Sequence, residues 1–120
     1  MKVNQDVRES AVVLGVAGDI DSATVDTLIR ELDEALSVAS DHQRRVLVVD
    51  LGNVTYFGSA GLNAVLGCYQ NGLADDVAVR VVATAAEVLR PLQVTKLDAV
   101  ICPYPSVTQA LAGSAGDVRS

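Results

Sequence analysis

Two hydrophobic patterns alternate along the chain, one typical of strands and the other typical of helices that pack on a sheet. Short runs rich in Val, continuous or alternating with polar residues, are separated by segments in which apolar residues recur at i, i+3, i+4 and i+7. The runs that predict strands are 3–7, 11–18, 46–51, 77–83 and 99–102. The segments that predict helices are 25–39, 62–69, 84–92 and 103–113.

This order of elements predicts a single α/β domain with a mixed, mainly parallel sheet of about five strands and with about four helices. Strands that alternate with helices pair in parallel through right-handed crossovers, and the helices then cover the sheet. We place the domain at residues 1–112 and expect residues 113–120 to form a flexible C-terminal tail.

Polar residues and one proline indicate where the helices begin and end. Asp21 precedes the first helical segment and is predicted to cap it, and "TAAE" from Thr84 to Glu87 has the spacing of a capping box. Pro91 falls about two turns into the third helix, where its missing N–H predicts a kink or an end.

The charge and hydropathy of the chain exclude two classes of partner. The formal net charge is -6, from 15 acidic and 9 basic residues, and no basic cluster exists beyond Arg44-Arg45. Neutralising phosphates requires several Lys or Arg on one face, so no direct nucleic-acid partner is predicted. No apolar run is long enough to span a bilayer, and "MKVNQDVRES" contains no apolar signal region. We therefore expect a cytoplasmic protein without membrane insertion.

The two cysteines do not predict a metal site. Cys68 and Cys102 are far apart in the sequence, and together with the single His42 they fall short of the four ligands of structural zinc. No metal or cofactor is predicted. The thiols are either reduced and packed or a redox pair, and pairing requires Cα atoms within about 7 Å of each other.

The stretch "VTYFGSAGL" raises the question of what Ser59 does. A hydrolase elbow needs glycine two residues before its nucleophile, where this chain has Phe57, and a catalytic triad would have to use His42 as its base. A phosphate-binding P-loop needs a lysine that is missing here. We therefore predict no enzymatic activity. Three interpretations of Ser59 remain: a helix N-cap, a weak nucleotide cradle, and a serine that a kinase modifies.

A second loop, "GDID" over residues 18–21, is expected beside this serine. It leaves its predicted strand at the carboxyl end, the same end of the sheet at which "YFGSAG" emerges. A phosphate on Ser59 would then repel Asp19, Asp21 and any acidic group of a partner. The apolar residues expected to supply contact area are Tyr56, Phe57 and Leu62.

Both loops resemble those of the STAS domain of bacterial anti-sigma factor antagonists. The resemblance rests on "AVVLGVAGDIDSATVDTLIRELDEAL", "VLVVDLGNVTYFGSAGLNAVLGCYQ" and "SVTQAL", and it extends from about Val7 to Leu111. It implies a protein that binds an anti-sigma factor with serine kinase activity and so frees a sigma factor. It also implies that phosphorylation by this kinase ends the interaction and that a serine phosphatase reverses the modification.

The resemblance further implies roles for individual residues. The family's acceptor loop typically reads D-S-[ST]-G-L, which makes Ser59 the phosphorylated serine, and Asp21 matches an aspartate that lies near the phosphoacceptor. This chain departs from the pattern at Gly58, which replaces the Asp, and at Ala60, which replaces the second hydroxyl residue. The residues expected to bind the partner are Asp19, Asp21, Tyr56, Phe57, Gly58, Ala60, Gly61 and Leu62.

Two other functions remain open from the sequence. One is a STAS docking subunit clamped on the ATPase of an ABC lipid-transport assembly, and the other is a nucleotide-binding sensor module that uses the same loops. Detection of phospho-Ser59 separates the kinase switch from the docking subunit. Saturable binding of ATP or GTP would indicate the sensor.

Overall fold

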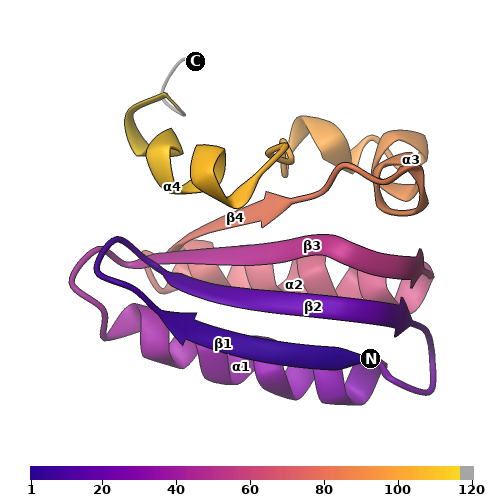
Figure 1. The fold of residues 1–120 in the computed structure, drawn as a ribbon, viewed down its shortest axis with the longest axis horizontal. Coiled ribbons are helices and arrows are strands. Elements are labelled where there is room, and N and C mark those ends of the chain that lie inside the picture. The colour runs from indigo at the N-terminus through magenta and orange to yellow at the C-terminus, as the bar shows by residue number, and fades with distance from the viewer. Residues whose placement is uncertain (117–120) are drawn as a thin grey trace.

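A mixed sheet with helices packed on it forms the predicted α/β architecture (Figure 1), in a computed structural model that describes residues 1–116. The sheet contains, in spatial order, β1 (Lys2–Val7), β2 (Val12–Ile20), β3 (Val46–Phe57) and β4 (Ala78–Val82). β1 pairs antiparallel with β2, whereas β2 with β3 and β3 with β4 pair in parallel. The described sheet is therefore mixed and mainly parallel as predicted, with four strands rather than about five.

The helices lie on both faces of this sheet. They are α1 (Val25–Ser40), α2 (Ser59–Ala74), α3 (Ala86–Val94), the 3-10 turn η1 (Leu97–Ala99) and α4 (Val107–Gly116). Figure 1 shows α1 and α2 side by side behind the strands, and α4 at the opposite side of the sheet near β4. The predicted helical stripe of α1 is confirmed, because Leu28, Leu32 and Ala35 are all buried.

The central strands are continuous apolar runs because both of their faces are buried. Leu14 of β2 and Leu47 of β3 point into the main core with α1, α2 and α3. Their neighbours Val13 and Val48 point to the other face, where a smaller cluster includes Ala110 of α4. Parallel strands covered on both faces are expected to show this continuous pattern rather than alternation.

The predicted last strand at 99–102 is wrong. Residues Leu97–Ala99 form η1 instead, and Tyr104 alone pairs with Val82 in an isolated parallel bridge. In this bridge the N–H of Tyr104 donates to the carbonyl oxygen of Val81 at 2.8 Å. Prolines 103 and 105 fix φ near -65°, away from the value of about -120° in a parallel strand, so regular pairing does not extend to either side.

Two predicted helix starts also differ from the structure. The N-cap of α1 is Thr24, and Asp21 instead closes the preceding turn, where its Oδ1 accepts hydrogen bonds from the N–H groups of Ala23 (2.9 Å) and Thr24 (3.2 Å). The predicted capping box of α3 is absent, because its N-cap is Ala85 and no side chain caps it.

The C-terminal parts of α3 and α4 run further than the sequence predicts. α3 continues past Pro91 to Val94, and the hydroxyl of Thr95 then donates to the carbonyl oxygen of Pro91 at 2.7 Å. α4 extends to Gly116, so residues 113–116 of the predicted tail are helical, whereas residues 117–120 lie outside the described residues. Within residues 1–116, no helix combines the length and apolar character needed to cross a membrane.

Candidate partner-binding site

The two loops singled out from the sequence meet at the carboxyl edge of the sheet, which we define as residues 19–24 and 55–61. The last residues of β2 and β3 are in register, with Asp19 opposite Tyr56 and Ile20 opposite Phe57. The N–H of Gly58 donates to the carbonyl oxygen of Ile20 at 3.1 Å. This hydrogen bond ties the start of α2 directly to the end of β2, so the expectation that the loops are neighbours is confirmed.

Irregular pairing between β2 and β3 shapes this edge. Register shifts occur between Gly15 and Ala17 and between Gly18 and Asp19, so β3 uses more residues than β2 over the same length of ladder. The second shift leaves Thr55 without a register partner, and the hydroxyl of Thr55 donates to Oδ1 of Asp19 at 2.5 Å. Gly18 lies at this shift with a φ of 98°, a left-handed value that favours glycine.

Both carboxylates of the β2 loop are held by hydrogen bonds within the loop or to β3. Asp19 is bonded to Thr55, and half-buried Asp21 accepts the two backbone N–H groups of its own turn. The hydroxyl of Thr24 completes the loop, because it donates to the carbonyl oxygen of Asp19 and accepts from the N–H of Asp21, both at 3.0 Å. The loop therefore presents two fixed negative charges at the carboxyl edge.

Ser59 is exposed, and it is the first residue of α2, so its interpretation as the helix N-cap is wrong. The N-cap is Gly58, and no side chain caps the helix. The first intrahelical hydrogen bond joins the N–H of Leu62 to the carbonyl oxygen of Gly58 at 3.0 Å. Among the described residues, the hydroxyl of Ser59 makes no hydrogen bond, which leaves it available to another molecule.

The other predicted contact residues divide between the surface and the core. Asp19 is exposed, Tyr56 is 53% exposed, and Gly58 and Ala60 are half-buried. Phe57 and Leu62 are buried, so they expose little of the contact area expected of them, and their contact with a partner stays a prediction. Both side chains pack beneath the loop. Gly61 is buried there too, and it packs so closely that a Cβ added to it would lie 2.6 Å from Cγ2 of Ile20.

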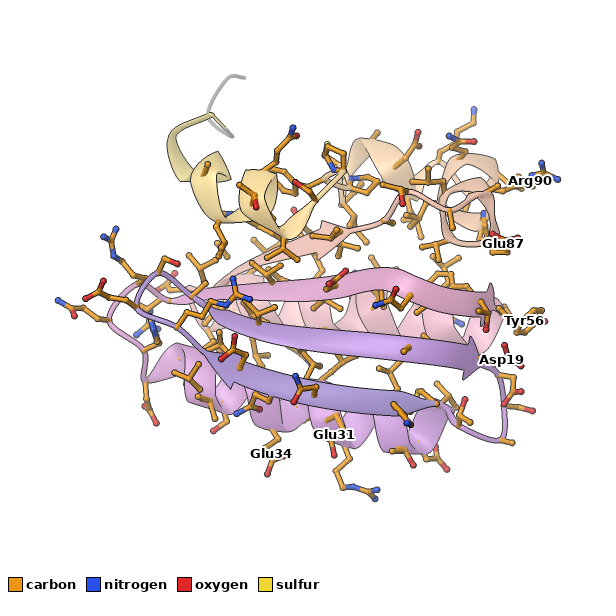
Figure 2. All side chains as sticks on the ribbon, viewed as in Figure 1. Asp19, Glu31, Glu34, Tyr56, Glu87 and Arg90 are labelled. Carbon is orange, nitrogen blue, oxygen red and sulfur yellow. The ribbon has the colours of Figure 1, made fainter. Side chains whose placement is uncertain are left out.

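A second source of side chains at this edge was not predicted from the sequence. Figure 2 shows Glu87 and Arg90 of α3 at the same end of the molecule as Asp19 and Tyr56. Arg90 is exposed, and no ion pair joins it to another residue of the described chain. The available signal was topological, because α3 follows the carboxyl end of a third parallel strand and therefore starts at the same edge.

The two cysteines are free and line different clefts. Cys68 is buried beside Ile29 and Asp33 in a cleft of about 160 Å³ between α1 and α2, whereas exposed Cys102 lines a cleft beside β4. Burial, and secondarily the charge of Asp33, raises the pKa of the Cys68 thiol to about 12. The Cys68–Cys102 redox pair stays a prediction. No group of three or more His, Cys, Asp or Glu within the described part of the chain could hold a metal ion.

Fold and site together define a single sheet domain with a serine-bearing helix start beside an acidic loop, and comparison with known proteins gives this class a name. The STAS domain family matches residues 2–110, so the chain belongs to the STAS domain family.

Its relatives include anti-sigma factor antagonists. The chain is 30% identical over 104 residues to the anti-sigma-F factor antagonist RsfB of Mycobacterium tuberculosis, which covers 87% of this chain and 81% of that protein. The crystal structure of an anti-sigma factor antagonist from Mycobacterium paratuberculosis superposes with a TM-score of 0.84 at 26% identity, covering 95% of this chain and 93% of that chain. The anti-sigma factor antagonist SpoIIAA in its unphosphorylated form has the same fold, with a TM-score of 0.74 at 16% identity over 96% of this chain and 97% of that chain.

Proposed function

We propose that this protein is an anti-sigma factor antagonist that binds a kinase-type anti-sigma factor through the carboxyl edge and is switched off by phosphorylation of Ser59. The observation that carries the proposal is an exposed, unbonded serine hydroxyl at the start of α2, tied by the Gly58–Ile20 hydrogen bond to a loop with two fixed carboxylates. The names of the relatives support the anti-sigma factor antagonist part of this proposal.

The position of Ser59 indicates that a phosphate would leave the fold intact. The N–H groups of the first helical turn precede the first intrahelical hydrogen bond, and a helix N-terminus favours negative charge. A phosphoserine there adds a charge of about -1.5 to -2 at pH 7. The modified edge would therefore differ from the unmodified edge mainly in charge, because the new phosphate joins Asp19 and Asp21.

The catalytic groups for the transfer would come from the partner. The hydrogen bonds of Asp19 and Asp21 go to Thr55 and to the turn of residues 23–24, and within the described residues neither carboxylate is hydrogen-bonded to the Ser59 hydroxyl as a general base would be. The chain has a single histidine, His42, whose Nε2 lies 2.7 Å from the carbonyl oxygen of Arg8 in a different loop. The protein thus acts as the substrate and ligand of a kinase, and a serine phosphatase restores its binding.

The test is a pull-down from the native host with wild-type, Ser59→Ala and Ser59→Asp baits, followed by mass spectrometry of the partners and of Ser59 itself. Ser37→Asp serves as the matched control, because Ser37 is an exposed serine in the C-terminal half of α1. We expect wild type, Ser59→Ala and Ser37→Asp to retain an anti-sigma factor with a kinase domain. Ser59→Asp should lose it by about 100-fold in affinity, as an unpaired charge in an interface costs about 3 kcal/mol or more.

Two outcomes would contradict the proposal. Retention of the anti-sigma kinase by Ser59→Asp at wild-type level would remove the switch. Equal recovery of a different partner on all four baits, such as the ATPase of an ABC lipid-transport assembly, would make the protein a docking module.

A further inference from the structure

The backbone conformation at position 58 does not require glycine. Its φ of -84° and ψ of -179° are extended values that any residue adopts. The constraint on this position comes from Tyr56. A Cβ added to Gly58 would lie 3.2 Å from both Cε2 and Oη of the Tyr56 ring, which is tighter than ordinary van der Waals contact. The ring therefore lies against the backbone of the residue directly before Ser59, in space that a side chain at position 58 would need.

The backbone of Tyr56 is held by its neighbours on β2 and β3. Tyr56 is opposite Asp19 in the register, and the carboxylate of Asp19 is bonded to Thr55, the residue before Tyr56. Figure 2 shows Tyr56 and Asp19 projecting at the same end of the molecule. Tyr56 is 53% exposed and is therefore a large, partly apolar group at the surface near Ser59. Tyrosine in this setting is a frequent energetic centre of protein interfaces.

We propose that Tyr56, seated on Gly58, determines which anti-sigma factor this protein accepts. The inference rests on the proposed function and names the group that the partner reads next to Ser59. The phenol offers an apolar ring and a hydroxyl that donates a hydrogen bond, so the matching surface is an apolar pocket with a hydrogen-bond acceptor. In a D-S-[ST]-G-L loop the corresponding position carries a carboxylate, which only accepts hydrogen bonds and would compete with the ring for space.

This arrangement works by exclusion as well as by attraction. Some related partners would carry a cationic group that pairs with a carboxylate at position 58. In this protein that group would have no carboxylate to pair with and would lie against the phenol of Tyr56, which weakens binding. Specificity between related partners commonly depends on such a mismatch. The pair Tyr56 and Gly58 should therefore behave as one unit, because a Cβ at position 58 would lie 3.2 Å from the ring and force it to shift by a few tenths of an ångström.

The test uses calorimetric titration of the anti-sigma factor recovered above with four proteins: wild type, Tyr56→Ala, Gly58→Asp and the double variant. We expect Tyr56→Ala to weaken binding about 30-fold, as for an interface hot spot. Gly58→Asp should weaken binding to a similar degree, and the double variant should be little weaker than either single variant. Leu73→Ala is the control, since Leu73 is 62% exposed in the C-terminal half of α2 and should bind within twofold of wild type.

A readout without the partner tests the seating of the ring. Because an aromatic ring shifts the resonances of the backbone beneath it, the Gly58 amide signal in an NMR spectrum should move in Tyr56→Ala and remain in place in Leu73→Ala. An unmoved Gly58 signal, or wild-type binding by Tyr56→Ala, would overturn the specificity proposal alone. If the wild type binds no anti-sigma factor, the proposed function fails and this inference fails with it.

Discussion

The two edges of the sheet are built from different chemistry. At the carboxyl edge, the carboxylates accept hydrogen bonds from Thr55 and from the turn of residues 23–24, whereas the Ser59 hydroxyl is exposed and makes no hydrogen bond to another described residue. At the opposite edge, which we define as residues 40–45 and 75–78, the guanidinium of Arg45 donates to the carbonyl oxygens of Ser40 (3.0 Å), Asp75 (2.5 Å) and Asp76 (3.1 Å). At this second edge, which we call the amino edge, the guanidinium of Arg45 is therefore hydrogen-bonded within the protein.

The backbone of the amino edge is also held by hydrogen bonds among its own residues. Arg45 and Asp76 both have left-handed φ values, 55° and 59°, although neither is glycine. The carbonyl oxygen of Arg45 accepts the N–H of Ala78 at 2.9 Å, and its guanidinium bonds the carbonyls at the ends of α1 and α2. Such conformations persist where surrounding hydrogen bonds over-determine them. Ligands of open α/β sheets bind at the carboxyl ends of the strands, so one edge stabilises the fold and leaves the other available for binding.

The largest stability effect that would sharpen this comparison is expected for Gly61→Ala at the carboxyl edge. The new Cβ would lie 2.6 Å from Cγ2 of Ile20 and 3.1 Å from two ring carbons of Phe57, so the first turn of α2 must move. Overpacking of this kind costs about 2 kcal/mol. We expect a lower free energy of unfolding in urea and weaker partner binding together, because Ser59 moves with the turn.

Gly67 in the same helix provides the matched control. A Cβ there meets nothing within 4 Å, so Gly67→Ala should raise the free energy of unfolding by about 0.5–1 kcal/mol and leave partner binding unchanged. Equal stabilities for the two alanine variants would mean that α2 does not rest on Ile20 and Phe57 as the structure describes.

At the amino edge, Arg45→Met should reduce stability without affecting binding. The substitution removes one cation that bonds carbonyls at the ends of α1 and α2, and we expect a loss of about 1–2 kcal/mol in urea unfolding, limited by the exposure of Arg45. Arg44→Met is the control, because the side chain of Arg44 makes no hydrogen bond to another described residue. A change in partner affinity for Arg45→Met would show that the two edges are not separable.

The elements that pack in the core between the two edges were predicted well from the sequence. Helical stripes and apolar runs report burial directly, so α1, α2 and the three parallel strands β2, β3 and β4 follow from periodicity. The helical stripe of α2 also predicts that Leu62 is buried, because Leu62 shares its helical face with Val65, a core residue. Burial leaves little of Leu62 to contact a partner.

Details that depend on competition between similar groups were not predictable. Asp21 and Thr24 are both good caps, and the choice between them depends on the turn that Asp21 closes with its own backbone. Ser59 lost the N-cap position to Gly58, whose extended backbone precedes the helix. The hydrogen bond between Thr55 and Asp19 depends on a register shift. The shifts do show in the sequence, because the buried residues Leu51, Val54 and Phe57 of β3 are spaced by three rather than two, but that spacing does not say which hydroxyl meets which carboxylate.

The smallest expected effect concerns Cys68, in the helix that connects the two edges, and appears only at high pH. Burial raises the pKa of this thiol from 9.0 to about 12, so the unfolded chain releases the proton first. The contribution to stability is therefore complete below pH 9 and is lost as the pH rises from 9 to 12. Between pH 8 and pH 10, the free energy of unfolding of wild type should fall by about 1.4 kcal/mol more than that of Cys68→Ala. Cys102→Ala should follow wild type, and a parallel decline in all three proteins, or a disulfide between Cys68 and Cys102 after mild peroxide treatment, would show that α2 opens at its centre and that neither edge is independent of it.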